Sequence, residues 1–396
     1  MTARWQNGEM PHRHLEHEPW DPHLATEGRD PRDVYDEARG RCPVAPRAGG
    51  GWTVFGHAAA VEVASRSDLY SNAVSRFLQV PNGLDGPRHA AVRRAIDPLF
   101  EAARMRDLEP RIARVASALV AEIALPARVD AVALGARFAV RAQCAWLGWP
   151  ADLEEELLAW MADNHAATRS RDTRRTAAVA ERFDAIITRL TAERRAAGTD
   201  APDDVTTELL RVRVEGEPLT DPEVTSILRN FTGGDLGSMA LCAGVILTYI
   251  ADHPPLQSRL RSGVSDAEGD AILDEILRID DPFLANRRRA SVDTSLAGHE
   301  IAAGDVVIVN WTAANRDPAA FGDPDAFAPE ANRDANLVYG IGPHVCPGRP
   351  LATLELRVLV REVLARTSEI AVDSERTRVR SMPPLGGFEE APLVLR

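Results

Sequence analysis

One short segment near the C-terminus, "VYGIGPHVCPGRP" (residues 338–350), limits this chain more than any other feature. It holds a single cysteine, Cys346, among three glycines and three prolines, and a helical pattern with Leu351, Leu354 and Val358 on one face follows at once. Glycine lets a backbone bend tightly and approach a flat partner. Cys346 should therefore stand at a helix N-terminus, where the dipole and free amides favour a thiolate. Such a stiff loop suits a metal ligand, whereas a nucleophile would need a histidine base and an open site.

Composition excludes several classes of function. The 396 residues are 45% hydrophobic, which is enough for a sizeable core, and the net charge of -13 argues against nucleic acid or an anionic membrane surface as a partner. No apolar run of membrane-spanning length and no signal-like start are expected, which predicts a cytoplasmic protein. Cys42, Cys144, Cys242 and Cys346 form no CxxC pair, so we expect neither a zinc ribbon nor disulfides, and the first three should be buried.

The chain divides into a tail and one domain. Residues 1–25 read as a flexible tail, whose histidines can be a metal site but fit a solvated segment better: His12, His14, His17 and His23. Residues 26–396 read as a single domain, mainly α with a minor β-sheet region. Within it, residues 52–70 predict a strand and a helix, residues 87–277 a series of helices, and residues 294–317 a small sheet.

The cysteine segment resembles the haem-binding loop of the cytochrome P-450 family, F-x-x-G-x-x-x-C-x-G. Tyr339, Gly342, Cys346 and Gly348 occupy the four fixed positions, with tyrosine in place of phenylalanine. The resemblance implies that Cys346 is the proximal iron ligand and that the loop binds haem b (heme b, iron protoporphyrin IX), with His344 facing a propionate and Gly340 beside the cofactor. It also implies a triangular, helix-rich prism that holds the haem between a long distal helix and this loop.

Three further motifs fit the same family. "DGPRHAAVR" matches its D-x-P-x-H-x-x-x-R pattern, in which His89 and Arg93 contact the haem propionates; a basic surface helix is the alternative. Arg288 matches R-x-A-x-x-D and would reach the other propionate, with Arg287 and Arg289 pointing the opposite way on a strand.

Glu275 and Arg278 match the family's buried E-x-x-R pair. In the family an arginine just before the haem loop joins the pair, but the corresponding position here holds Ala331. Either Arg333 substitutes by a shifted path or the group is reduced to a pair, and the first alternative is preferred.

The distal helix departs from the family pattern A/G-G-x-D/E-T-T/S. In the family the acid and the alcohol deliver protons during oxygen activation, but here their positions hold Leu236 and Gly237. Three explanations stay open. Water or a substrate group can supply the proton; Asp235 and Ser238 can take over if the helix bulges near Gly233 and Gly234; or the protein uses peroxide. A structural role for Asp235 is an equal alternative to a role in proton delivery.

Apolar segments corresponding to the family's substrate-recognition regions predict the pocket, although each residue can equally be core. Its predicted lining is Phe77, Leu78, Val80, Arg229, Gly233, Phe283, Leu284, Ala285, Asn286, Leu385 and Phe388. The expected activity is a monooxygenase that inserts one atom of O2 into a small or medium apolar or aromatic molecule.

Electrons should come from a separate ferredoxin or flavodoxin with its NAD(P)H-dependent reductase, because no reductase segment follows residue 396 and no anchor precedes the fold. The carrier should dock near His344 and Arg349 on a monomer. Two rival functions are a peroxide-driven oxidase and, as a non-enzyme, a haem-based sensor.

Overall fold

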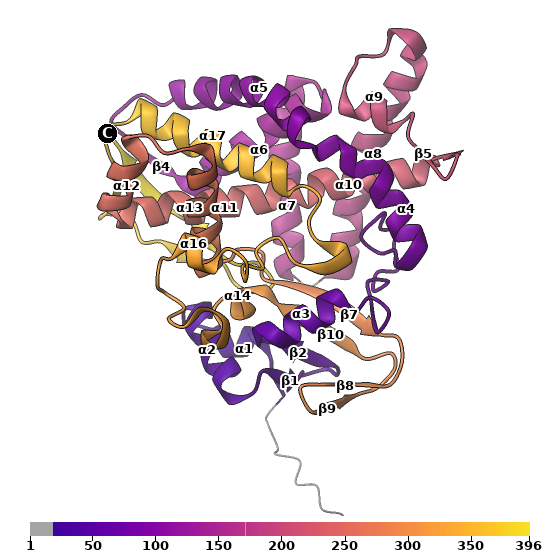
Figure 1. Ribbon diagram of the computed structural model, residues 1–396. Helices are drawn as coiled ribbons and strands as arrows, with labels where there is room; N and C mark the ends of the chain where they lie inside the picture. Colours follow the sequence, from indigo (N-terminus) through magenta and orange to yellow (C-terminus); the bar gives the residue numbers. More distant parts are fainter. Residues whose placement is uncertain (1–18, 171) are drawn as a thin grey trace, which may run out of the picture.

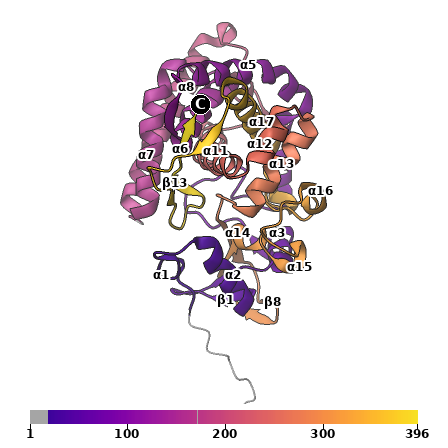
Figure 2. The same cartoon turned by 90° about the vertical axis from the view of Figure 1, so that its left-hand side faces the viewer.

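Helix α11 (Asp235–Asp252) lies at the centre of the helical part of the molecule (Figures 1 and 2). The structure, a computed structural model, describes residues 19–170 and 172–396. Twelve of the 18 residues of α11 are buried, because the helix is apolar around its whole circumference and is covered on every side. Helices α6, α13 and α17 pack against it, and α5 covers α6 and α17. The bounds of these four are Ala102–Ala121 (α5), Ala131–Leu147 (α6), Asp266–Ile279 (α13) and Arg349–Arg366 (α17).

The backbones of α6 and α11 approach each other closely because small residues face each other. A Cβ atom on Gly135 of α6 would lie 2.6 Å from the Cβ of Ala243 and 3.0 Å from the carbonyl oxygen of Ala240. One turn away the roles reverse, and a Cβ on Gly244 of α11 would lie 2.6 Å from a methyl of Val132. These positions fix the separation of the two helices and hence the place of α11 above the cysteine loop.

A break at Gly234 separates α11 from α10 (Asp221–Gly233), as the glycine pair in the sequence suggested. The two helices together span 32 residues and contain one window that is apolar enough to cross a membrane by length and composition, contrary to the expectation that no such stretch exists. Two-thirds of its most apolar window (67%) is buried inside the fold, which is the burial of a core helix.

A second helical layer covers the break between α10 and α11. Trp160 of α7 and Phe183 of α8 stack with ring centroids 4.1 Å apart, and both rings lie against Gly233. The elements of this layer and the helix that precedes the bundle are α4 (Gly86–Ile96), η1 (Asp97–Phe100), η2 (Ala151–Leu153), α7 (Glu154–Ser170), α8 (Thr173–Ala197), η3 (Gly198–Asp200) and α9 (Val205–Leu209).

A five-stranded sheet forms the lower part of the molecule in Figure 1, in the order β1-β2-β10-β7-β3. Only the β2–β10 pair is parallel. The bounds are Val44–Pro46 (β1), Trp52–Val54 (β2), Tyr70–Ser71 (β3), Ala285–Ala290 (β7) and Val306–Asn310 (β10). Helices α2 (Pro31–Arg41) and α3 (His57–Ser65) lie beside this sheet in Figure 1. The predicted strand and helix of residues 52–70 are therefore confirmed.

The remaining elements are short. Three small sheets are β11-β14-β4 (Ile370–Val372, Pro392–Leu395, Ala127–Asp130), β12-β13 (Val379–Arg380, Phe388–Glu390) and β5-β6 (Arg213–Val214, Glu217–Pro218). A hairpin, β8-β9 (Thr294–Leu296, His299–Ile301), stands apart from β10, so residues 294–317 form parts of two sheets. The short helices are α12 (Pro254–Arg261), α14 (Trp311–Ala314), α15 (Pro318–Phe321) and α16 (Pro329–Asn332).

The predicted boundary of the tail at residues 25 and 26 falls inside helix α1 (Pro22–Thr26). Just before it, the indole of Trp20 packs edge-on against Phe55 and Tyr35, and its amide donates to the carbonyl of Pro46. Trp20 is therefore already part of the packed fold. The predicted histidines of the tail before this point lie outside the described residues. A mainly helical chain with a minor sheet region is confirmed.

Candidate functional site

Cys346 lies where the sequence predicted, between η4 (Gly342–His344) and the start of α17. The amide of Cys346 donates to the carbonyl of Tyr339 at 2.9 Å, which closes the loop on itself. Gly342 has a φ of +78°, and a Cβ there would lie 2.7 Å from the carbonyl oxygen of Ala64. Glycine is therefore required at this position, because it lets the loop pack directly on the backbone of α3.

The thiol of Cys346 is accessible, and the protein groups around it desolvate it. This desolvation raises the pKa of the thiol. The amides of Gly348 and Arg349 and the charge of Arg93 oppose this rise in pKa. Among the described residues no histidine contacts the sulfur, so a bound cation is the partner that would favour the thiolate over the thiol.

The ring of Tyr339 lies in the cysteine loop, and its hydroxyl contacts α17. The hydroxyl lies 3.2 Å from the hydroxyl of Thr353, and the Arg349 guanidinium covers the ring at 5.2 Å from its centroid. Burial raises the pKa of the phenol, so it stays neutral. Gly340, with a φ of +71° and open space around it, gives the loop its turn. The tyrosine therefore fills the expected aromatic position and links loop and helix.

Three basic side chains converge near the loop, and each has a buried nitrogen without a hydrogen-bond acceptor. His89 of α4 and His344 of η4 lie with ring centroids 3.9 Å apart, and the Nε2 atom of each is buried without a hydrogen bond. The Nε atom of Arg288 is buried in the same way, and burial lowers the pKa of its guanidinium to about 10. Asp85 is the acid facing them, 3.3 Å from His344 Nε2. One carboxylate faces three basic side chains, so the set has room for the carboxylates of a ligand as further partners.

The alternation on β7 was predicted correctly, because Arg288 is buried while Arg287 and Arg289 are exposed. Burial, together with the neighbouring charges of His89 and Arg288, lowers the pKa of His344 to about 4. At neutral pH the ring of His344 is therefore uncharged and can donate one hydrogen bond. These residues can hold the carboxylates of a haem, and Cys346 can bind its iron.

Arg93 of α4 is engaged with the cysteine loop itself. Its Nη1 atom donates to the carbonyls of Val345 at 3.0 Å and Pro343 at 3.2 Å, while its Nε donates to Asp97 at 2.7 Å. Arg93, which was predicted to contact a propionate, therefore also ties α4 to the loop. Its charge also lowers the pKa of Cys346.

The buried pair of the E-x-x-R motif is present, and an amide completes it. Arg278 donates to both oxygens of Glu275, at 2.8 and 2.9 Å, and to three loop carbonyls, and both side chains are almost inaccessible. The third partner is Asn332, whose Nδ2 donates to Glu275 at 2.7 Å. The preferred reading of Arg333 was wrong, because its side chain is half-exposed and pairs with Glu330 at 3.0 Å. α16 directs residue 332 inward and residue 333 toward solvent.

Asp235 does not face the position of the missing threonine. Its carboxyl accepts a short hydrogen bond from Gln143 of α6, and burial raises its pKa to about 7. Nearby on α17, Glu355 is buried with both oxygens unpaired, and burial raises its pKa well above the ordinary value. On a helix, residues two positions apart point in directions that differ by about 200°. Residues 235 and 237 therefore face nearly opposite sides of α11. The structure favours the structural reading of Asp235.

Ser238 uses its hydroxyl within its own helix. The Oγ atom donates to the carbonyl of Gly234 at 2.8 Å and lies 3.1 Å from the carbonyl of Asp235. It therefore stabilises the backbone at the helix break and is not directed as a free donor. A residue that the sequence analysis missed, His165 of α7, places its Nε2 atom 3.0 Å from where a Cβ on Gly237 would be. A lone histidine on a polar helix gave no signal.

The predicted pocket residues separate into exposed and buried groups. Phe77, Leu78 and Phe283 are 51%, 44% and 43% exposed, which is unusual for large apolar side chains. In contrast, three predicted lining residues are packed in the core, because their side chains meet other apolar groups: Val80, Leu284 and Phe388. For these three the pocket role stays a prediction, and their burial agrees equally with the core alternative. Ala285 and Leu385 are half-buried.

Two polar residues of the predicted pocket have structural partners. Arg229 donates to Asp184 at 2.6 and 2.7 Å and to the carbonyl of Leu78 at 2.7 Å, so it clamps α10 to α8 and to the segment that carries Leu78. Asn286 accepts a hydrogen bond from the indole of Trp311 at 2.8 Å. Both side chains therefore make structural contacts within the fold.

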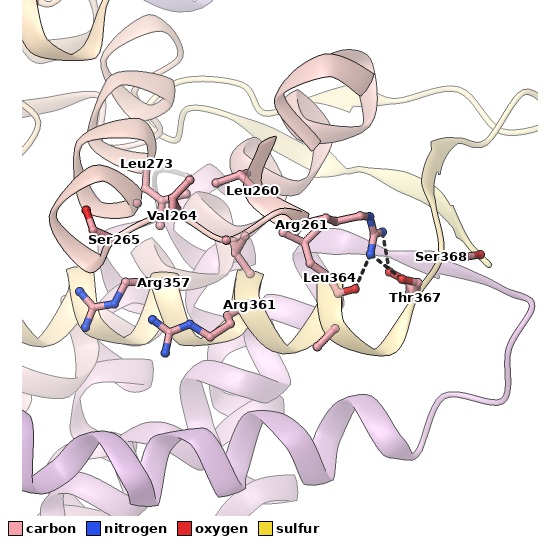
Figure 3. A pocket seen from close by; sticks show the side chains of 14 residues that line it. Leu260, Arg261, Val264, Ser265, Leu273, Arg357, Arg361, Leu364, Thr367 and Ser368 are labelled. Atoms are coloured by element: carbon pink, nitrogen blue, oxygen red, sulfur yellow. Dashed lines mark hydrogen bonds between the residues drawn. The ribbon is translucent and has the colours of Figure 1, made fainter. Parts of the chain in front are cut away.

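A groove of about 610 Å³ lies away from this site, between α12, α13 and α17 (Figure 3). It is lined by three arginines, Arg261, Arg357 and Arg361, whose guanidinium groups are already bound to carbonyls or carboxylates. Cys346 does not line it. We therefore assign the chemistry to the cysteine loop.

The chain is similar to proteins of one family across most of its length. The family model described as Cytochrome P450 matches residues 157–384. The "Erythromycin C-12 hydroxylase" of Saccharopolyspora erythraea is 30% identical over 88% of this chain and 90% of that protein. The "Linalool 8-monooxygenase" of Pseudomonas putida is 28% identical over 89% and 92%. A solved structure of a mutant of P450 EryK in complex with erythromycin B has a TM-score of 0.83 and 28% identity, and it covers 95% of this chain and 98% of that one.

Proposed function

Because the chain belongs to the cytochrome P450 family of haem-dependent monooxygenases, we propose that it inserts one oxygen atom from O2 into a small or medium apolar organic molecule. The fold is the family's fold, and its cofactor is haem b. When bound, the haem supplies activation of dioxygen, assisted by a thiolate ligand. Insertion of one oxygen atom would hydroxylate a carbon, and at a carbon next to an ether oxygen it would lead to loss of the alkyl group as an aldehyde. Oxidative coupling would instead remove one hydrogen atom from each of two phenol groups without inserting oxygen.

The observation that carries the site assignment is the accessible sulfur of Cys346, together with three buried basic side chains whose nitrogens lack hydrogen-bond partners. Cys346 would bind the iron, and the amides of Gly348 and Arg349 would keep its sulfur anionic. His89, His344 and Arg288 would hold the two carboxylates and orient the ring. Each group then gains the partner that it lacks among the described residues.

The absorption of the ferrous–carbonyl form tests this assignment. The wild-type protein should show the long-wavelength band of a thiolate-ligated haem, and Cys346→Ser should lose it. Cys242→Ser is the matched control, because Cys242 lies on α11 and should leave the band in place. A Cys346→Ser protein that kept the band would refute the ligand assignment.

An apolar substrate is supported by the exposed rings and side chain of Phe77, Phe283 and Leu78. The names of three relatives refer to erythromycin, cyclomarin C and linalool, which supports an organic small molecule as the substrate. Binding should displace water from the iron and shift the ferric spectrum. A library of apolar and highly polar compounds of matched size provides the test, and shifts produced only by the polar set would contradict the proposal.

We further propose a cytoplasmic enzyme that receives electrons from a separate ferredoxin or flavodoxin. The docking surface would include the guanidinium of Arg349, whose side chain is 53% exposed beside the loop. His344 is buried and cannot belong to this surface. Turnover with a ferredoxin, its reductase and NAD(P)H should exceed turnover with hydrogen peroxide. The opposite result would favour the peroxide-driven alternative, for which the lack of an alcohol at Gly237 is the supporting observation.

A further inference from the structure

His165 points the tip of its ring directly at the backbone of α11. A Cβ on Gly237 would lie 3.0 Å from Nε2, and the two ring carbons beside that nitrogen would both lie 3.9 Å away. The ring axis through Nε2 therefore passes through the position that a side chain at residue 237 would occupy. In this chain a group from α7 fills the place where α11 has none.

The ring nitrogens of His165 make no hydrogen bond with any residue in the ranges 19–170 and 172–396. The charged groups that face it are Arg169, on its own helix, and Glu389 of β13, which pair with each other at 3.6 Å. Burial and the charge of Arg169 lower the pKa of the imidazole from 6.5. Near neutral pH the ring therefore carries one donor and one acceptor, and no described residue hydrogen-bonds to either.

We propose that His165 supplies the hydrogen-bonding group that Gly237 lacks and holds a hydroxyl, from water or from the substrate, beside α11. His165 is a positioning residue in this inference, which rests on the proposed haem site. The neutral ring can accept a hydrogen bond from the hydroxyl or donate one to it, whereas the protonated ring can only donate. The hydroxyl should therefore reorient when the imidazole gains a proton.

A spectral titration of the ferric holoprotein tests this inference. Between about pH 5 and about pH 9, the wild-type spectrum should change with a one-proton midpoint below the ordinary value for histidine. His165→Gln and His165→Leu should both abolish the change, while His253→Gln, at the exposed C-terminal end of α11, should keep it. A titration seen without added compound identifies water as the source of the hydroxyl. One that appears only with hydroxylated compounds identifies the substrate.

The inference is overturned if His165→Leu keeps the same midpoint or if the wild type shows no titration in either arm. The ferrous–carbonyl band, recorded on every variant, separates this result from a failure of the proposed function. If the band is present throughout, the haem site stands and only the role of His165 is decided.

A double-mutant cycle gives an independent check. Gly237→Thr should lower Tm because the new side chain meets the ring of His165, and His165→Ala should create room for it. The combined variant should therefore be more stable than the sum of the two single effects predicts. Simple additivity would show that the two positions do not share space and would overturn the geometry.

Discussion

The carboxylate of Glu275 is satisfied entirely by protein donors. Arg278 donates to both of its oxygens, while the Asn332 amide and the backbone of Ala328 donate to Oε1. Hydrogen bonds to buried charges contribute about 1.5–3 kcal/mol each. Asn332→Ala should lower the free energy of unfolding by about that amount, as measured by urea titration. Arg333→Ala is the matched control and should cost about 0–1 kcal/mol, because its pair with Glu330 is exposed.

The guanidinium of Arg288 should destabilise the haem-free protein but help the holoprotein to retain haem. Its guanidinium is buried with an unpaired Nε, and burial lowers its pKa to about 10, which reports a disfavoured charge. Arg288→Leu should therefore raise the Tm of the haem-free protein while reducing haem retention of the holoprotein. Arg287→Leu, on the exposed side of β7, should change neither value much. A fall in Tm of both forms would contradict a role for Arg288 in binding an anion.

At the scale of elements, a Gly→Ala substitution should lower stability at the contact between α6 and α11 but raise it on an exposed helix surface. Gly135→Ala places a methyl 2.6 Å from Ala243, so the helices must separate and stability should fall by about 1–3 kcal/mol. Gly40→Ala in α2 meets nothing within 4 Å and should raise stability by about 0.5–1 kcal/mol through helix propensity. Thermal unfolding of both variants checks the pair. Equal effects would show that α6 and α11 tolerate a wider separation.

At the scale of the whole molecule, buried acids in the helical core should make stability depend on pH. The folded-state pKa of Asp235 is about 7, above its ordinary value, so the fold favours the protonated form. This contribution is complete below about pH 4 and is lost as the pH rises through 7. Asp235→Asn should therefore gain stability relative to wild type by about 1–4 kcal/mol between pH 5 and pH 8.

Urea unfolding at the two pH values measures this difference. Asp107→Asn, an exposed change on α5, is the control and should show no such trend. Glu355 has a folded-state pKa raised in the same direction, so it adds to the wild-type loss at high pH. A pH dependence unchanged in Asp235→Asn would assign the effect to Glu355 alone.

The sequence predicted the parts of the site that depend on local spacing. Cys346, Tyr339 and the Glu275–Arg278 pair follow from loop and helix geometry over a few residues. Asn332 could not be found in this way, because it meets Glu275 across 57 positions and only the course of the loop decides which of two neighbours points inward. His165 reaches Gly237 from another helix and belongs to no motif. Such contacts are properties of packing rather than of sequence spacing.

The same distinction explains the pocket. Apolar residues serve equally as core and as lining, and only the fold shows that Val80 is buried while Phe77 and Leu78 are exposed. The helix series was predictable from its periodicity, whereas the division of residues 294–317 between two sheets depends on pairing partners far along the chain.

The attachment of the segment around Leu78 to α10 has a practical consequence for altering selectivity. Arg229 and Ser226 donate to the Leu78 carbonyl, and Ser226 and Asn230 bond the backbone of Val80. The main chain here is anchored independently of the outward-facing side chains. Saturation libraries at positions 77 and 78 should therefore yield folded clones at high frequency, so that screening can sample new specificities without compensating mutations elsewhere.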